Sequence, residues 1–193
     1  MPNWCTNELY IIAKKKTVLS KFCAKAGLKK ASPEFLLAKL YPEPDYDKVE
    51  VKPTFPQIKG SNDPVDSSHS WWDWRIQNWG TKWDIGELDV DIVYGEFKAY
   101  VGKTRNGDPE YNMRPYAQIT FDTAWSPPEP ALIKIGKNHP EIAFALQYSE
   151  PGCDFEGELV IVDGEITVQQ FRESRPEIHW IADQAATDMG EGE

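Results

Sequence analysis

Residues 71–83 read Trp-Trp-Asp-Trp-Arg-Ile-Gln-Asn-Trp-Gly-Thr-Lys-Trp and hold five of the eight tryptophans in the chain. Such a density of large rings predicts a helix that is buried along one side. Ser70 is a candidate N-cap because its hydroxyl can accept an early backbone N–H, and Gly80 is free to end the helix with a positive φ. The rest of the chain is therefore expected to fold around this helix.

Two stripes follow from the 3.6-residue period of this helix. The first, which we predict to be core together with the later Trp83, comprises Trp72, Ile76 and Trp79. The second mixes rings with an amide and comprises Trp71, Trp74 and Asn78. If the second stripe stays accessible, its rings can stack on a nucleobase, Asn78 can bond a base edge and Lys82 can meet a phosphate. The alternative is that these rings also fill the core.

The composition limits the partners. The 193 residues fit one domain, and the net charge is −10, from 21 Lys and Arg against 31 Asp and Glu. This charge disfavours binding to duplex nucleic acid, because such binding depends on Lys and Arg. A small anionic ligand in a local pocket and a basic protein partner both stay open.

The cysteines are few and far apart: Cys5, Cys23 and Cys153. Their spacing suits neither a disulfide framework nor a zinc site, and we expect no metal and no cofactor. The first residues lack the basic and apolar regions of a signal peptide, and no apolar run reaches the roughly 18 residues that would cross a membrane. We therefore expect a protein of the reducing cytoplasm that does not enter membranes.

Hydrophobic periodicity and turn signals divide the rest of the chain. Strands are predicted at 4–13, 88–94, 96–101, 116–121, 142–148, 155–162 and 165–170. Further helices are predicted at 17–26, with Thr17 as N-cap and Gly27 at the end, and at 128–137. Hairpin turns are expected at Asn106-Gly107 and Asp163-Gly164.

This order predicts an α+β fold, in which helices pack on one face of an antiparallel sheet. Residues 1–171 are expected to form the single domain, with a long insertion at 45–68 and an extra C-terminal hairpin. The stretch 172–193 carries a charge of −4, from two Arg and six acidic residues, and is expected to be a disordered tail.

Two loops carry candidate polar groups. Asp122 and Trp125 lie in the turn Asp-Thr-Ala-Trp-Ser before the predicted helix at 128–137, whose N-terminus can bind an anion. We favour a capping turn, with Asp122 or Ser126 as the cap. Glu150 opens an acidic loop that can serve acid–base chemistry or hold a divalent metal, although a solvated acidic rim is the favoured interpretation.

Four motifs carry a resemblance to a known family. They are Met-Pro-Asn-Trp-Cys-x-Asn at 1–7, Trp-x-x-x-Asn-Trp-Gly-Thr-Lys-Trp at 74–83, Phe-Asp-Thr-Ala-Trp-Ser-Pro-Pro at 121–128, and Tyr-x-Glu-Pro-Gly-x-x-Phe-x-Gly at 148–157. In this order, over residues 1–170, the chain resembles the YubB-like ferredoxin-like domain family of phages, prophages and plasmids. The resemblance implies a ferredoxin-like α/β plait and a mobile-element origin, without iron–sulfur chemistry, since three scattered cysteines cannot hold a Cys₄ cluster.

Three classes of function remain. The favoured one is a non-enzymatic binding protein that counteracts host defence, either by trapping a small nucleotide-type ligand in a Trp-rich cleft or by blocking a basic host protein. The ligand site is predicted at Trp71, Trp74, Asn78, Thr81, Lys82, Asp122, Trp125 and Glu150. The others are a nucleotide-cleaving enzyme that uses Asp122, Glu150 and Lys82, and a structural accessory protein. Exposed edge strands also suggest a homodimer.

Overall fold

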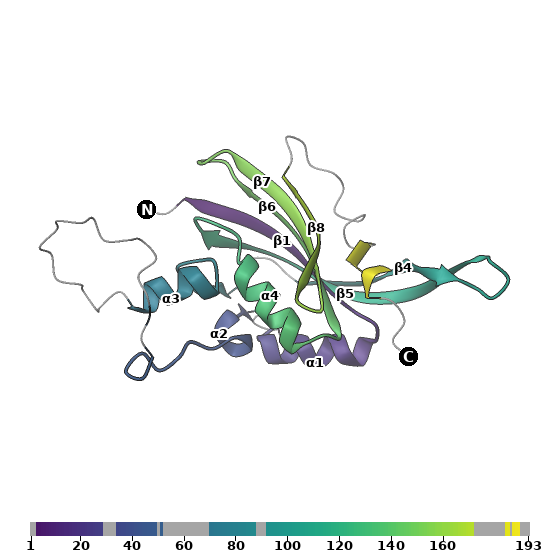
Figure 1. Ribbon diagram of the computed structural model, residues 1–193, viewed down its shortest axis with the longest axis horizontal. Coiled ribbons are helices and arrows are strands. Elements are labelled where there is room, and N and C mark those ends of the chain that lie inside the picture. Colours follow the sequence, from purple (N-terminus) through teal and green to yellow (C-terminus); the bar gives the residue numbers. More distant parts are fainter. Residues whose placement is uncertain are drawn as a thin grey trace, which may run out of the picture.

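A six-stranded antiparallel sheet forms the centre of the computed structural model (Figure 1). The structure describes residues 3–28, 34–49, 51, 70–87, 92–171, 184–185 and 187–189. In spatial order the strands are β4 (Val93–Lys103), β5 (Pro109–Ala124), β1 (Trp4–Ala13), β6 (Ile142–Glu150), β7 (Phe155–Val162) and β8 (Glu165–Phe171). The N-terminal strand thus lies in the middle of the sheet, as its almost wholly apolar second half requires.

Helices cover one face of this sheet (Figure 1). They are α1 (Lys16–Ala26), α2 (Leu37–Leu40), α3 (Ser70–Asn78) and α4 (Glu129–Asn138). A separate ladder of two short strands, β2 (Glu34–Phe35) and β3 (Gly86–Glu87), joins the segments that flank α2 and α3. The predicted α+β class and the antiparallel sheet are confirmed.

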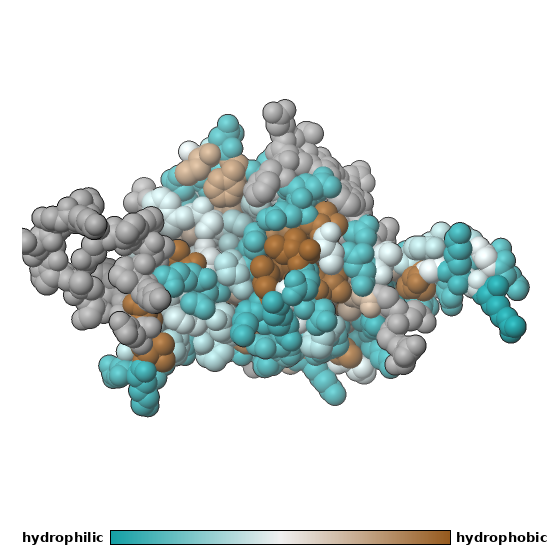
Figure 2. All heavy atoms as spheres, viewed as in Figure 1, coloured by the Kyte–Doolittle hydropathy of each residue, from teal (hydrophilic) through white to brown (hydrophobic). Residues whose placement is uncertain are grey.

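The main core lies between the helices and the sheet. Alternation along β1 directs Leu9 and Ile11 into it, where they meet Phe22 of α1 and Leu132 of α4. The helices therefore bury the apolar face that the period-2 pattern of the strands creates. At the surface, Figure 2 shows apolar side chains gathered over α4 and β8.

A second, smaller core lies on the opposite face of the sheet. Tyr10 and Ile12 of β1 belong to it, and Ala185 near the C-terminus packs there with no exposed surface. We expected a disordered tail over 172–193, and that expectation is wrong at Ala185 and Met189, which contact this core. Small side chains across the sheet, such as Ala143, leave room for the C-terminal segment.

The β4–β5 hairpin extends well beyond the rest of the sheet (Figure 1). We expected shorter strands at 96–101 and 116–121, but β4 and β5 continue to the turn that Asn106-Gly107 marks, where Gly107 has a φ of +89°. Both faces of the hairpin tip meet solvent, so no apolar alternation reveals its length in the sequence. Residues 88–91, the first part of the strand predicted at 88–94, lie outside the residues that the structure describes.

Helix boundaries differ from the predictions in small ways. α1 begins at Lys16 after an uncapped Lys15, so Thr17 is not its N-cap, whereas Gly27 ends it with a φ of +95° as expected. α4 begins after Pro128 without a side-chain cap. Most of the insertion predicted at 45–68 lies outside the described residues. Within the described part of the chain, no helix is long and apolar enough to span a membrane.

Candidate functional site

Hydrogen bonds bring the four sequence motifs together at one end of the sheet. The backbone N–H of Trp125 donates to the Asn3 carbonyl at 2.9 Å, which joins the end of β5 to the start of β1. The Asn3 side-chain amide donates to the Cys153 sulfur at 3.3 Å, which adds the turn between β6 and β7. The hydroxyl of Thr81 bonds to Ala124 and adds the loop after α3. We call this region, residues 3–7, 80–83, 121–126 and 150–153, the N-terminal corner.

A buried polar chain holds the corner in place. Asn7 has no exposed surface, and its amide donates to the Cys5 carbonyl and to the Thr123 hydroxyl, both at 2.8 Å. The Thr123 hydroxyl donates in turn to the Ser126 carbonyl at 2.8 Å. Buried donors that are paired in this way stabilise one arrangement of the loops, because any other arrangement would leave them unsatisfied.

The turn before α4 is not the capping turn that we predicted. The Asp122 carboxylate accepts the Thr6 hydroxyl at 2.8 Å, and the Ser126 hydroxyl donates to the Gly80 carbonyl, so neither side chain reaches the helix N-terminus. Trp125 adopts a φ of +76°, which is uncommon for a residue with a Cβ. The turn therefore connects the corner instead of capping α4, and it projects the Trp125 ring outward.

Three indole rings on the corner are exposed. The exposed fractions are 49% for Trp4, 37% for Trp83 and 48% for Trp125. The rings of Trp4 and Trp83 lie with their centroids 5.8 Å apart, and the Lys82 amine lies 4.8 Å from the centroid of Trp83. We call Trp4, Trp83 and Trp125 the tryptophan platform.

The rings of α3 are placed differently from the prediction. Trp79 is buried as expected, and its indole N–H donates to the Tyr41 carbonyl at 3.0 Å. Trp74 is also buried and meets Trp79 edge-to-face at 5.7 Å, whereas Trp72 is only half-buried. The core stripe is thus rotated, because Trp74 packs against the Tyr41 ring of the segment after α2. Trp83, predicted to be core, is exposed because it lies beyond the helix end.

The predicted amide and hydroxyl of the site serve the fold. The Asn78 oxygen accepts the Tyr41 hydroxyl at 2.7 Å, and the Asn78 nitrogen donates to the Trp74 carbonyl at 3.0 Å. Thr81 is fully buried. Trp71 is half-buried, with the Arg75 guanidinium 5.2 Å from its ring centroid. These contacts fix the end of α3 against α2 and β5.

Glu150 organises the turn that follows β6. Its carboxylate accepts the backbone N–H groups of Gly152, at 2.8 Å, and of Cys153. Burial by itself raises the pKa of the Glu150 carboxyl, but hydrogen bonds from the Cys153 thiol and from these N–H groups hold that pKa below its usual range. The charged carboxylate therefore stabilises the turn, and its role is structural.

The predicted site residues thus fall into two groups. Five lie in the corner: Thr81, Lys82, Asp122, Trp125 and Glu150. Three lie on α3 beside it: Trp71, Trp74 and Asn78. The sequence prediction missed Trp4, although Trp4 lies in the first motif and is the first residue of a strand. Among the described residues, no three His, Cys, Asp or Glu side chains cluster in a way that could hold a metal ion.

A comparison with known protein families supports the fold. Residues 96–188 match the family described as a ferredoxin-like domain in Api92-like protein. The predicted ferredoxin-like fold is therefore confirmed, and the match extends through the buried C-terminal residue Ala185. The crystal structure of protein api92 from Yersinia pseudotuberculosis aligns with 91% of this chain and 100% of its own, at 9% identity and a TM-score of 0.47. No curated protein matches the sequence.

Proposed function

We propose that this chain is a non-enzymatic binding domain that engages a basic protein partner through the tryptophan platform. The observation that supports it is the exposure of three indole rings on one corner of an acidic protein. Large rings left in water retain the apolar area that a partner can bury, and tryptophan is enriched among the residues that dominate binding energy in interfaces.

The rigidity of the corner favours this role. Trp125 is held by the bond between its backbone N–H and Asn3, and Trp83 follows Thr81, which is tied to β5. A backbone that hydrogen bonds already hold in place loses little conformational entropy on binding. The platform is therefore pre-organised for contact with a second molecule.

Charge favours a basic partner. The chain carries −10, and Asp122 of the corner is exposed. The face of Trp83 already lies against a cation, the Lys82 amine, at 4.8 Å. Guanidinium groups of a partner can lie in the same way against the exposed rings of Trp4 and Trp125. If the chain comes from a mobile element, as its motifs suggest, a host defence protein is the natural candidate for this partner.

A nucleotide-type ligand is the second candidate, favoured by the proximity of the Lys82 amine to an exposed ring. A base could stack on Trp83 or Trp125, with its phosphate at Lys82. The predicted base-edge contact from Asn78 is weakened, because both ends of that amide are engaged by Tyr41 and Trp74. The protein partner therefore ranks first.

Affinity capture from bacterial extract tests the proposal with three forms of the chain. They are the natural sequence, the platform variant Trp4→Ala/Trp125→Ala, and the control variant Tyr100→Ala/Tyr111→Ala, which removes two exposed rings from the distant hairpin. We expect a basic protein to bind the natural and control forms, to be lost from the platform variant, and to elute at high salt. Recovery of the same proteins with all three forms would refute the proposal that the tryptophan platform binds the partner.

The same preparations separate the two candidates. Mass spectrometry of small molecules released by heating is expected to find no stoichiometric nucleotide. An intact nucleotide recovered from the natural form but not from the platform variant would replace the protein partner by the second candidate. A chemically converted nucleotide would instead indicate an enzyme and contradict both.

A further inference from the structure

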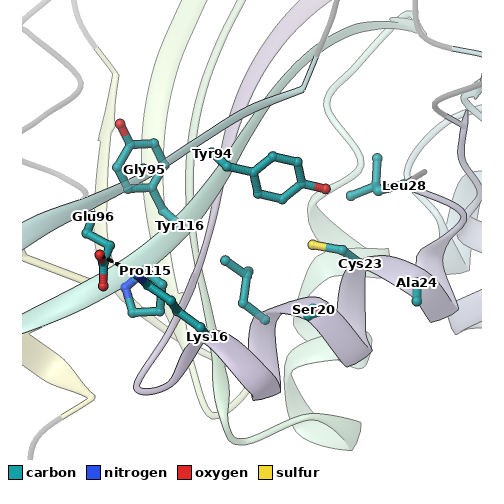
Figure 3. Close-up of a pocket in the computed structure, with 11 residues that line it drawn as sticks. Lys16, Ser20, Cys23, Ala24, Leu28, Tyr94, Gly95, Glu96, Pro115 and Tyr116 are labelled. Atoms are coloured by element: carbon teal, nitrogen blue, oxygen red, sulfur yellow. Dashed lines mark ion pairs between the residues drawn. The ribbon is translucent and has the colours of Figure 1, made fainter. Parts of the chain in front are cut away.

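A cavity of about 590 Å³ lies between α1 and the β4–β5 hairpin (Figure 3). On the helix side it is lined by the small side chains of Ser20, Cys23 and Ala24. A helix that packs on a sheet normally fills the intervening space with large side chains, since protein interiors are close-packed. Small residues at three neighbouring positions leave this space open. Its volume lies in the range of about 300–1,000 Å³ that small-molecule sites occupy.

The walls of the cavity are mainly apolar. Leu19 and Leu28 line it from the α1 side and belong to the main core, with 5% and 4% of their surfaces exposed. Pro115 lines it from β5. An apolar molecule that enters would exchange contact with water for contact with these side chains.

Two polar groups lie on opposite walls of the cavity. Figure 3 shows the Tyr94 hydroxyl pointing across it toward the Cys23 thiol. Burial raises the pKa of Tyr94 to about 12 and that of the Cys23 thiol to about 11, so both groups are neutral at pH 7. The oxygen of the neutral Tyr94 phenol has lone pairs that can accept a hydrogen bond from a ligand.

The mouth of the cavity carries one ion pair. The Lys16 amine lies 2.7 Å from the Glu96 carboxylate, and both residues line the opening. Because the two charges already neutralise each other, a charged ligand finds no unpaired partner at the mouth. The electrostatics therefore favour an uncharged ligand.

We propose that this cavity binds an uncharged, mainly apolar ring compound with a single N–H or O–H donor, which hydrogen-bonds to the Tyr94 oxygen. The size of the cavity sets the ligand at two or three rings, and the neutral lining selects against charge. This site is separate from the tryptophan platform and does not depend on the function proposed for it.

Two dyes with the same ring skeleton test this proposal. N-phenyl-1-naphthylamine is uncharged and has one N–H, and 8-anilinonaphthalene-1-sulfonate adds a sulfonate to the same rings. With the natural protein we expect saturable fluorescence enhancement by the uncharged dye at one site per chain. The sulfonate should bind at least about tenfold more weakly, because its charge would be left unpaired near Glu96. Equal affinity for the two dyes, or no saturable binding of the first, would overturn the proposal.

Three variants locate the site. Ser20→Trp places a large ring in the cavity and should abolish binding, whereas the matched control Lys21→Trp adds the same ring at an exposed position of α1 outside the lining. Tyr94→Phe removes only the hydroxyl and should weaken binding about three- to tenfold, the effect of one hydrogen bond. Binding that is unchanged in Ser20→Trp or in Tyr94→Phe would place the dye elsewhere. If Ser20→Trp fails to fold, Tyr94→Phe decides alone.

Discussion

The Thr81 hydroxyl forms two hydrogen bonds with the backbone of Ala124: it accepts the N–H at 3.1 Å and donates to the carbonyl at 3.3 Å. Both residues are buried. This pair ties the loop after α3 to the end of β5, and Trp4 is the neighbour of Ala124 in β1. Two rings of the platform, Trp4 and Trp83, therefore come from segments that meet at one residue.

Thr81→Val should destabilise the fold. The variant keeps the shape of the side chain but leaves the buried N–H of Ala124 without a partner, which costs about 1–3 kcal/mol. Urea unfolding followed by circular dichroism measures the loss. Thr81→Ser keeps the hydroxyl and serves as the control, and equal losses in the two variants would contradict the importance of the hydrogen bonds.

Gly80→Ala should be more damaging than Gly107→Ala. Both glycines have positive φ, +80° and +89°. In both variants alanine must therefore adopt a left-handed backbone conformation, which costs about 1–2 kcal/mol. At Gly80 a Cβ would also lie 2.6 Å from Cδ of Pro130, whereas at Gly107 it would meet open space. We expect the difference between their unfolding free energies to be at least about 1 kcal/mol. Equal unfolding free energies would mean that α4 moves away from the added Cβ without loss of stability.

Trp79→Ala and Trp125→Ala should separate the core ring from the platform ring. Trp79 is 1% exposed, and its removal should cost about 3–5 kcal/mol of unfolding free energy. Trp125 is 48% exposed, and its removal should change that energy by no more than about 0.5–1 kcal/mol. Thermal unfolding of both variants checks this, and a large loss from Trp125→Ala would show that the platform is part of the core.

Stability should fall in acid through Glu150. The folded-state pKa of this carboxyl is lowered from its ordinary 4.5, so the folded state prefers the charged form. Its contribution is therefore present above pH 4.5 and is lost as the pH falls below that value through the lowered pKa. Glu150→Gln should flatten the pH dependence of unfolding in this range. Glu110→Gln removes an exposed acid of the hairpin and should leave that dependence unchanged.

One thiol of three should react with Ellman's reagent in the folded protein. Cys153 is exposed, whereas Cys5 and Cys23 are buried, and burial raises their pKa to about 12 and about 11. Their thiolate fractions at pH 8 are therefore very small. We expect one reactive group per chain before unfolding and three after it. In Cys153→Ser the folded protein should show none, and rapid reaction of that variant would mean that a buried cysteine becomes accessible.

Much of the fold could be predicted from local patterns. The predicted bounds of β1 match the observed ones, and the β7–β8 hairpin turns at the predicted Asp163-Gly164, because apolar runs and turn residues are signals within a short stretch of sequence. The hairpin of β4 and β5 was underestimated because its tip is exposed on both faces. The C-terminal segment was misjudged because it is polar overall and contributes only small contacts, such as Ala185, to the second core.

The sequence by itself determined the helices, the antiparallel strands and the clustering of tryptophan in one segment, since each depends on periodicity within a short window. Only the tertiary structure decided which rings meet solvent. Trp74 is covered by Tyr41, and Trp83 is left exposed beside Trp4, which lies far away along the chain. Exposure depends on which distant segments pack together, and no local pattern records that choice.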